Sequence, residues 1–297
     1  MVNLPRIGLT VGDPAGIGPE IAQKAVRNPR VITACEPFIY GPFTEKELQP
    51  YQPGKLSAAA GRMAHDVVVD IVRDARAGRI DAIVTAPINK EAFSKAGLPW
   101  LGHTDLLAHL TESDRVAMMF YSEKLRVILA TAHLPLAKVS SALTIERVKS
   151  TIELAALELP RLGYSSPRLA LSGLNPHAGE HGVIGNEDEL VLVPAVVSSR
   201  AYGIDVVGPL PADTVFVQAV RGKFDAVIAC YHDQGLIPIK LLAFGKAVNV
   251  TLGLPIIRTS VDHGTAFDIA GQGIADPSSM IEAVLLAAKL VRGSRQE

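Results

Sequence analysis

The 297-residue sequence has few cysteines, no clear excess of charge and no long apolar run. Its two cysteines, Cys35 and Cys230, adjoin apolar residues and form no CxxC pair, which favours reduced, packed thiols over disulfides. The net charge of −1, without a basic patch, argues against a nucleic-acid partner. Neither a membrane span nor a signal peptide is evident, so we expect a soluble, cytoplasmic protein that acts on a small molecule.

The sequence also lacks an obvious linker, a low-complexity tract and a visible internal repeat. Short apolar runs alternate with longer helical patterns, which indicates an α/β fold with a mainly parallel sheet. The length suits either two domains or one large one. The periodicity predicts strands at 6–11 and 80–85, and helices at 20–26, 58–77, 144–159, 187–199 and 279–291.

The glycine-rich loop at 12–20 follows the first predicted strand but does not have a nucleotide-binding spacing. Its glycines fit neither GxGxxG nor the P-loop, so a Rossmann fingerprint is rejected. The glycines would allow a tight turn and close helix packing. Asp13 and Glu20 remain candidate site residues.

Three apolar, strand-like runs each end in a histidine, namely His133, His177 and His232. In an open α/β sheet, ligands collect outside the carboxyl ends of the strands. Three imidazoles at that edge would suit zinc or a neighbouring metal and would leave coordination positions open for a substrate. The alternative for each histidine is a hydrogen-bonded structural role.

Polar residues follow several other predicted strands. The segment 85–90 could present amides and Lys90 to an anion, or it could simply cap a helix. The segment 102–105 offers His103 and Thr104 beside a glycine, and a plain turn is the alternative. Two prolines would hold Asp213 in place, although aspartate is also a common helix N-cap.

The segment 231–235 places four polar-capable side chains directly after a buried-looking strand, a density that packing does not explain. Further along, Lys240, Asn249 and Arg258 lie among apolar residues. Cations in such surroundings need partners, so a phosphate or carboxylate ligand is one interpretation. Salt bridges or side chains that reach the surface are the other.

Taken together, these motifs resemble the 4-hydroxythreonine-4-phosphate dehydrogenase family over nearly the whole chain. The resemblance rests on the blocks 12–20, 85–90, 102–104, 172–180, 231–236, 248–270 and 251–255. It implies an isocitrate/isopropylmalate dehydrogenase-like fold, with two α/β/α domains, a cleft between them and a homodimer that completes the active site. We place one domain at 1–110 with 240–297 and the other at 111–239.

The resemblance also implies roles for individual residues. Metal ligands would be His133, His177 and His232, shared between subunits, and substrate contacts would be His103, Thr104, Lys240, Asn249 and Arg258. Catalytic roles would fall to Asp213 and Lys240. The cofactor loop would include His263, Gly264, Thr265, Ala266 and Asp268. Because an acid repels a 2′-phosphate, Asp268 favours NAD over NADP.

The implied reaction is a metal-dependent oxidation of 4-phosphohydroxy-L-threonine by NAD, followed by loss of carbon dioxide, in pyridoxal phosphate biosynthesis. Nitrogen ligands favour zinc or cobalt over magnesium or manganese. The first alternative is a dehydrogenase for 4-phospho-D-threonate or 4-phospho-D-erythronate. A metal-dependent hydrolase or lyase and a non-catalytic phosphometabolite-binding protein are the others.

The sequence departs from the family pattern in three places. Asp105 replaces a more usual glutamate, His181 interrupts a glycine pair, and the region 40–57 is shorter than is typical. We expect the shortened region to be peripheral. His181 could alter substrate shape or could be a surface substitution.

Overall fold

The computed structural model describes residues 4–295, which form two compact units. Unit 1 comprises Met1–Val116 and Leu254–Glu297, and unit 2 comprises Ala117–Gly253. The borders expected from the sequence, after residues 110 and 239, therefore lie 6 and 14 residues before the observed ones. As a result, Lys240 and Asn249 lie in unit 2 and Arg258 lies in unit 1.

Unit 1 contains four parallel strands in the order β2-β1-β3-β10. Their bounds are Arg6–Thr10 for β1, Glu36–Tyr40 for β2, Ala82–Thr85 for β3 and Ile257–Ser260 for β10. Strand β3 is buried along its whole length, as a strand covered on both faces should be. The carboxyl ends of these strands share one edge.

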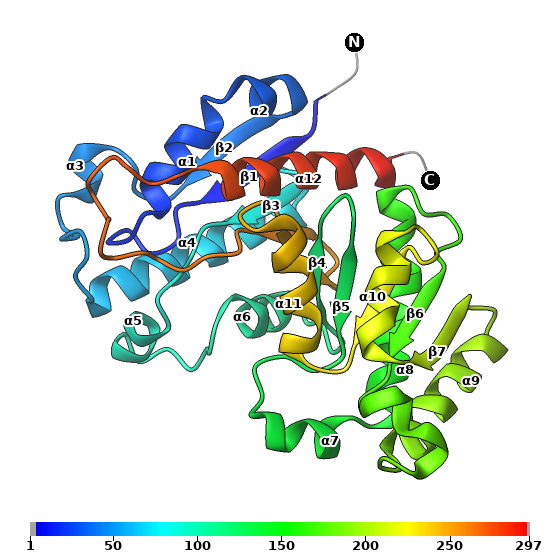
Figure 1. The fold of residues 1–297 in the computed structure, drawn as a ribbon. Coiled ribbons are helices and arrows are strands. Elements are labelled where there is room, and N and C mark those ends of the chain that lie inside the picture. Colours follow the sequence, from blue (N-terminus) through cyan, green and yellow to red (C-terminus); the bar gives the residue numbers. More distant parts are fainter. Residues whose placement is uncertain (1–3, 296–297) are drawn as a thin grey trace. The chain divides into compact units, whose positions relative to one another are not determined.

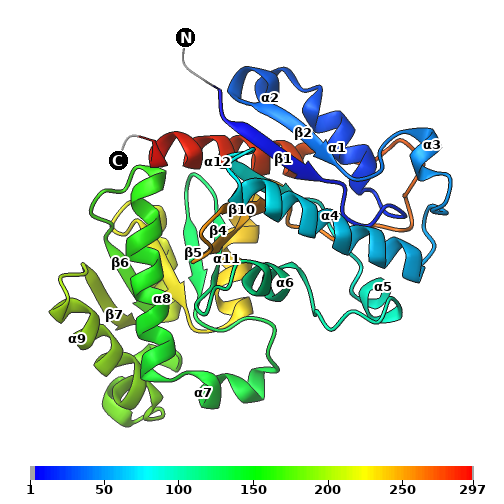
Figure 2. The same ribbon diagram turned by 180° about the vertical axis from the view of Figure 1, so that it is seen from behind.

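Helices cover both faces of the unit 1 strands. Figure 1 shows α1 (Gly18–Val26), α2 (Pro29–Ala34) and α12 (Ser278–Ser294) on one face. Figure 2 shows α4 (Ala58–Arg76) on the other, with α5 (Lys90–Lys95) and α6 (His103–Leu110) beside it. The short helix α3 (Glu45–Leu48) lies in the shortened region and has no buried residue. Among the described helices, none combines the length and the apolar character that a membrane span needs.

Unit 2 has six strands in the order β9-β4-β5-β8-β6-β7. Strand β4 pairs antiparallel with β9 and β5, whereas β5, β8, β6 and β7 run parallel. The bounds are Ala117–Tyr121 for β4, Arg126–Leu129 for β5, Leu169–Ser172 for β6, Val206–Leu210 for β7, Ala226–Ala229 for β8 and Val248–Leu252 for β9. The three predicted histidine-ending runs correspond to β5, β6 and β8.

Helices again lie on both faces of the unit 2 strands. Figure 1 shows α10 (Ala212–Val220) and α11 (His232–Ala243) on one face. Figure 2 shows α8 (Ile145–Glu158) and α9 (Val193–Ala201) on the other. A short helix, α7 (Val139–Ala142), follows β5, and a π-helical turn spans Asp188–Leu192 before α9. The predicted helix 187–199 is therefore two segments.

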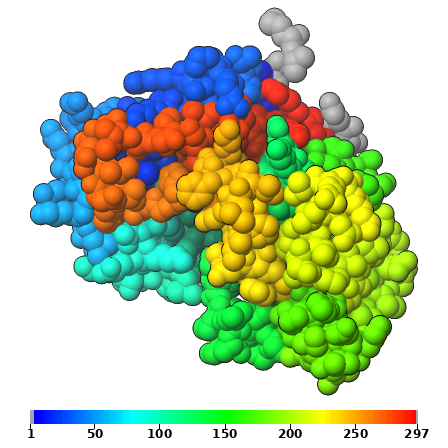
Figure 3. All heavy atoms as spheres, viewed as in Figure 1, coloured from blue at the N-terminus to red at the C-terminus, as the bar shows by residue number. Residues whose placement is uncertain are grey.

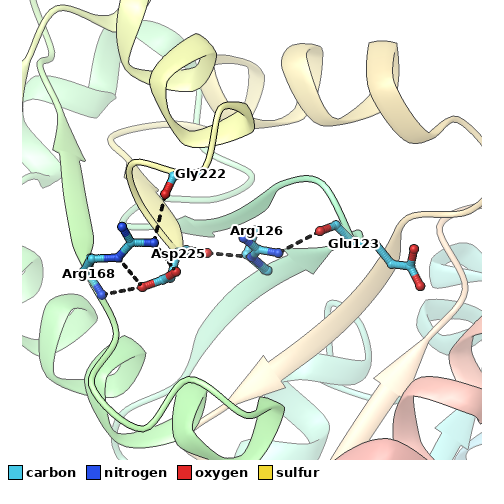
Figure 4. A network of polar contacts seen from close by, with 5 residues as sticks. All are labelled: Glu123, Arg126, Arg168, Gly222 and Asp225. Atoms are coloured by element: carbon cyan, nitrogen blue, oxygen red, sulfur yellow. Dashed lines mark hydrogen bonds and ion pairs between the residues drawn. The ribbon is translucent and has the colours of Figure 1, made fainter.

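A clamp between an arginine and an aspartate joins the amino ends of β6 and β8 in unit 2 (Figure 4). Arg168 donates from N and Nε to Asp225 Oδ2 at 2.8 and 3.1 Å, and from Nη2 to Oδ1 at 2.9 Å. The same Nη2 donates to the Gly222 carbonyl at 2.9 Å. Behind the clamp, Arg126 Nε donates to the Asp225 carbonyl at 2.6 Å and Arg126 Nη1 to the Glu123 carbonyl at 2.9 Å.

The same clamp occurs in unit 1, between β1 and β3. Arg6 donates from N and Nε to Asp81 Oδ2 at 2.7 and 3.3 Å, and from Nη2 to Oδ1 at 3.0 Å and to the Gly78 carbonyl at 2.8 Å. Both aspartates belong to a Gly-x-x-Asp-Ala segment, at 78–82 and 222–226. The chain therefore contains a local structural repeat, contrary to the expectation from the sequence.

Replacing Asp225 with asparagine is expected to lower the free energy of unfolding by about 1–2 kcal/mol at pH 7, because it breaks charge-assisted bonds to a half-exposed arginine. Hydrogen bonds from Arg168 lower the pKa of Asp225 below its ordinary value. The contribution of ionised Asp225 to the free energy of unfolding is fully present above the unfolded-state pKa of about 3.9. It is lost as pH falls through the lower folded-state pKa. Urea unfolding at a series of pH values from 7 to 3 measures this contribution. The difference in free energy of unfolding between the wild-type protein and Asp225→Asn should shrink as the pH falls.

The control for this prediction is Asp70→Asn, which removes the ion pair between Asp70 and Arg73 on the exposed side of α4. Its effect should stay within about 0.5 kcal/mol. Asp81→Asn should instead lose at least as much as Asp225→Asn, since Asp81 makes the same contacts with Arg6 and a further ion pair with Arg295 at 3.1 Å. Equal losses for Asp70→Asn and Asp225→Asn would contradict a specific role for the clamp.

Candidate functional site

Two of the three predicted metal ligands, His133 and His232, lie side by side in unit 2. They follow β5 and β8, which are neighbouring parallel strands, so both loops lie at the same edge. Their ring centroids are 5.6 Å apart, with the ring planes inclined by 41°. His133 is exposed and its backbone is left-handed, with φ of 51°. A strained backbone at a non-glycine residue is often found at functional positions.

The imidazole of His232 is oriented by the next residue along the chain. Its Nδ1 lies 2.7 Å from Asp233 Oδ1. A proton on Nδ1 satisfies that carboxylate and leaves the Nε2 lone pair available to a metal. His232 is also the first residue of α11, so its backbone position is fixed by the helix. This pairing of histidine and carboxylate is typical of metal sites.

The third histidine, His177, lies on a turn of left-handed backbone. All five residues from His177 to His181 have positive φ, between 44° and 79°. For residues other than glycine this conformation costs about 1–2 kcal/mol each, so surrounding contacts must hold it. The side chain of His177 is exposed, and its Nδ1 lies 3.8 Å from Glu180 Oε2. In His181 the side chain is 96% exposed, as a surface substitution would be.

Buried hydrogen bonds connect the three histidine loops at the ends of β5, β8 and β6. Thr131 Oγ1 donates to the Cys230 carbonyl at 2.7 Å. Gln234 Oε1 accepts from Cys230 N at 2.7 Å, while its Nε2 donates to the Gly173 carbonyl, also at 2.7 Å. The Cys230 thiol donates to the Ser172 carbonyl at 3.2 Å. These bonds fix the spacing of the loops independently of any ligand.

The donors present fit a metal ion only in part. The His133–His232 pair supplies two imidazoles, one of them within hydrogen-bonding distance of Asp233. Within residues 4–295, no three histidine, cysteine, aspartate or glutamate side chains come close enough to hold an ion together. The structure therefore brings His133 and His232 together but does not add His177 to them within one chain.

The remaining candidates in unit 2 occupy different elements. Asp213 lies exposed in the first turn of α10, whose N-cap is Pro211, so the alternative reading of Asp213 as the N-cap is wrong. Lys240 lies on α11, two turns after His232, and is partly buried. Asn249 lies on β9, and its buried Oδ1 has no hydrogen-bond partner among the described residues. A buried amide oxygen of this kind suits a ligand that donates a hydrogen bond.

In unit 1, Arg258 and Thr85 form a buried corner whose positive charge belongs to Arg258, and His103 adjoins it. Arg258 is buried on β10, and its Nη2 and Nε donate to Thr85 Oγ1 at 2.6 and 3.2 Å. Burial lowers the pKa of the guanidinium from its ordinary value, so a bound anion would stabilise the charged form. Threonine accepts these bonds without neutralising the charge.

His103 begins α6 and carries a neutral ring in this corner. Burial, followed by the charge of Arg258, lowers its pKa well below 6.5. Its Nε2 is enclosed and has no hydrogen-bond partner within the described part of the chain. Thr104 follows it in the first turn of α6 and is partly buried. A buried cation beside a neutral imidazole suits a phosphate or a carboxylate.

The predicted cofactor loop follows β10 and rests on the glycine-rich loop of unit 1. Ile17 N donates to the Thr265 carbonyl at 3.0 Å, and a Cβ at Gly16 would lie 2.9 Å from the same oxygen. Here glycine permits the close approach. Asp268 and His263 are exposed. The Gly264 carbonyl oxygen lies 3.0 Å from His263 Nδ1, and Ala266 has φ of 43°.

Among the other polar residues of unit 1, Glu20 and Asn89 have structural roles, and Asp13 is a buried carboxyl group. Glu20 Oε1 accepts from Ala275 N at 2.8 Å and pairs with Lys24, a structural role. Asn89 caps α5, and Lys90 is exposed. Asp13 accepts from Ala15 N through Oδ1, and burial raises its pKa. Its buried Oδ2 has no partner among residues 4–295.

Sequence reasoning missed three residues that shape these sites: Thr85 as the partner of Arg258, Gln234 as the bridge between two loops, and Asp188. The carboxylate of Asp188 is fully buried and accepts from Leu174 N and Asn175 N at 2.9 and 3.1 Å. The polar density of 231–235 was a signal for Gln234. The acidic start of the predicted helix at 187 was the only signal for Asp188.

Relatives of this chain are dehydrogenases. A 4-hydroxythreonine-4-phosphate dehydrogenase from Desulforapulum autotrophicum is 43% identical, with 96% of this chain and 95% of the relative covered. A D-threonate 4-phosphate dehydrogenase from Salmonella typhimurium is 44% identical, with 96% and 98% covered. The 4-hydroxythreonine-4-phosphate dehydrogenase structure from Klebsiella pneumoniae has a TM-score of 0.88 at 40% identity, covering 97% of this chain and 98% of that one.

The fold expectation is also confirmed. An isocitrate dehydrogenase structure from Methylococcus capsulatus matches with a TM-score of 0.51 at 19% identity, covering 97% of this chain and 88% of that one, which shows a shared fold alone. The family model described as pyridoxal phosphate biosynthetic protein PdxA matches residues 19–287. With relatives at this identity and coverage, the chain is a dehydrogenase, and it belongs to the PdxA family of pyridoxal phosphate biosynthetic proteins.

Proposed function

We propose that this protein oxidises the secondary hydroxyl of 4-phosphohydroxy-L-threonine with NAD as the acceptor, NADP being the alternative. The product, 2-amino-3-oxo-4-phosphobutanoate, would lose carbon dioxide to give 3-amino-1-hydroxyacetone phosphate. The observation that carries this proposal is the His133–His232 pair, with Asp233 orienting one imidazole, at the carboxyl edge of unit 2. Within this family of dehydrogenases, such a pair suits oxidation of an alcohol.

A divalent cation held by His133 and His232, with His177 as the third ligand, would supply Lewis acidity toward the substrate hydroxyl, and NAD would supply the hydride acceptor. Nitrogen donors favour zinc or cobalt, and magnesium and manganese are the alternatives. In unit 1, Arg258 and His103 would bind an anionic group of the substrate, assisted by Thr104. In unit 2, Asp213 would pair with the ammonium group of the substrate and take up its proton, while Lys240 and Asn249 would orient polar groups.

Asp213 favours the amino-acid substrate over a sugar acid. Its carboxylate is exposed in the first turn of α10, where it could pair with an ammonium group. The corresponding carbon of 4-phospho-D-threonate bears a hydroxyl instead. That substrate remains the second candidate because relatives named for each are 43% and 44% identical to this chain.

Steady-state kinetics on purified protein would decide between the substrates. The panel is 4-phosphohydroxy-L-threonine, 4-phospho-D-threonate and 4-phospho-D-erythronate, each with NAD. We expect the highest kcat/KM for the first, and a larger loss for it than for the others in Asp213→Asn. Turnover of the sugar acids alone would overturn the first choice and establish the second.

The exposed carboxylate of Asp268 leads to a cofactor prediction. We expect kcat/KM to be higher with NAD than with NADP, because the carboxylate would repel a 2′-phosphate. Asp268→Asn should reduce the preference by about tenfold, the effect of a like-charge contact of some 1.4 kcal/mol. Equal efficiency with both cofactors in the wild-type protein would contradict this role. Asp276→Asn, whose carboxylate is bonded to Ser278 instead, is the matched control.

We further propose a homodimer in which the metal site is completed by both subunits. One chain brings two histidines together, and the helix that starts at His232 carries an exposed apolar stripe. The stripe comprises Ile237 and Leu241, which are 60% and 82% exposed, and continues to Phe244, the C-cap residue, which is 84% exposed. Figure 3 shows α10 and α11 (yellow and gold) at the surface of unit 2. Contiguous exposed apolar side chains commonly mark an interface.

Leu241→Asp is expected to convert the dimer to a monomer that neither binds metal nor turns over substrate. Light scattering coupled to size exclusion measures the mass, and Co²⁺ titration measures the metal site. Leu157→Asp changes a leucine on α8 that is 65% exposed and should leave the dimer intact. A monomeric wild-type protein with full activity would refute the shared site.

A further inference from the structure

The left-handed turn that carries His177 depends on one buried carboxylate. Asp188 accepts from Leu174 N through Oδ1 at 2.9 Å, and from Asn175 N and Asn175 Nδ2 through Oδ2 at 3.1 and 3.0 Å. These residues lie directly after β6 and lead into the turn. Three donors converge on a fully buried side chain, so the start of the turn is fixed in position and direction.

The turn also packs directly on Asp188. A Cβ at Gly173 would lie 3.0 Å from Asp188 Oδ1 and 2.8 Å from the Ala178 Cα. A Cβ at Gly179, where φ is 79°, would lie 3.2 Å from the Asp188 Cβ. Backbone and carboxylate therefore approach so closely that the turn cannot shift while Asp188 keeps its place.

Asp188 is itself held in an unusual backbone segment. It is the first residue of the π-helical turn Asp188–Leu192, and such turns are frequent at functional positions. The preceding residue, Glu187, accepts from Asn175 Nδ2 at 2.9 Å and from Ser140 Oγ at 3.1 Å. Asn175 is thus bonded to both Asp188 and Glu187. The bond between Glu187 and Ser140 reaches the segment that follows His133.

We propose that Asp188 is a positioning residue for metal binding, which sets the direction in which His177 presents its imidazole. This inference rests on the proposed function, because it takes His177 as a metal ligand. Asp188 would act through the backbone of 174–181 and would not touch the metal or the substrate. Loss of a group that orients a ligand weakens metal binding by about tenfold to a hundredfold.

The test compares Asp188→Asn with Leu192→Ala in the full-length protein. Leu192 is equally buried and lies at the other end of the same π-helical turn, so its truncation controls for lost stability. Co²⁺ affinity is measured by calorimetry and visible absorption, and backbone order by amide hydrogen exchange. Asp188→Asn should raise the Kd for Co²⁺ by about tenfold to a hundredfold and accelerate exchange at Leu174 and Asn175. Leu192→Ala should lower Tm without either effect.

Unchanged Co²⁺ affinity in Asp188→Asn, or an equal loss in Leu192→Ala, would overturn the inference while the proposed function stands. A wild-type protein that binds no Co²⁺, Zn²⁺ or Mn²⁺ would instead refute the metal-dependent function and this role with it. Hydrogen exchange separates the two failures, because it reports the anchoring of the turn without any metal present.

Discussion

His232→Ala is expected to abolish metal binding and to reduce turnover by about a thousandfold or more. The substitution removes one of the two imidazoles that lie side by side, and several kcal/mol of charge stabilisation in the transition state would be lost with the cation. Bound metal per chain is measured by elemental analysis, and turnover by NADH absorbance. Tm should change little, since His232 is partly exposed at the start of α11.

The chain provides a matched control for this variant. His65 on α4 also faces the carboxylate of the next residue, with Nδ1 2.9 Å from Asp66 Oδ1. His65→Ala removes the same kind of pair outside the candidate site and should leave metal content and kcat unchanged. Wild-type activity in His232→Ala, or equal losses in both variants, would show that the metal site has been misassigned.

Arg258→Met should raise the KM for the phosphorylated substrate by about a hundredfold or more. Methionine keeps much of the buried volume but leaves the substrate anion without its cationic partner, and breaking a buried charge pair costs about 3–5 kcal/mol. Because the contact is to a group remote from the reacting carbon, kcat at saturation should fall less. Steady-state kinetics over a wide substrate range would separate the two constants.

Arg126→Met is the appropriate comparison for this result. Arg126 is also buried, but its hydrogen bonds go to the carbonyls of Asp225 and Glu123 (Figure 4). Its loss should lower Tm and leave KM unchanged. If Arg126→Met raises KM as much as Arg258→Met does, the effect of Arg258 comes from general loosening of the fold and the anion-binding role is wrong.

Much of the fold could be predicted from the pattern of apolar residues. The alternation of short runs and helical patterns predicted parallel strands, and the helix expected at 58–77 is observed at Ala58–Arg76. Burial on both faces gives such strands continuous apolar sequences, which is why β3, β5, β6 and β8 were visible. Placement of His133 and His232 at one edge followed from the same rule.

The rest depends on contacts between residues far apart in the sequence. The left-handed conformation of His177 runs against local preference and is stabilised by Asp188, eleven positions later. The repeated clamp went unseen because the arginine and aspartate are separated by 75 residues in one unit and 57 in the other. The two copies share an arginine and a Gly-x-x-Asp-Ala segment, which is too little for a repeat to be evident from the sequence alone.

The two clamps lie apart from the loops that we propose to act on the substrate. Both lie at the amino ends of the strands, whereas the histidine loops and the cofactor loop follow carboxyl ends. Selection can therefore alter the loops at one edge without weakening the attachment at the other. This division gives the fold capacity to acquire new substrates by small changes, which is consistent with relatives of nearly equal identity that carry the names of different phosphorylated substrates.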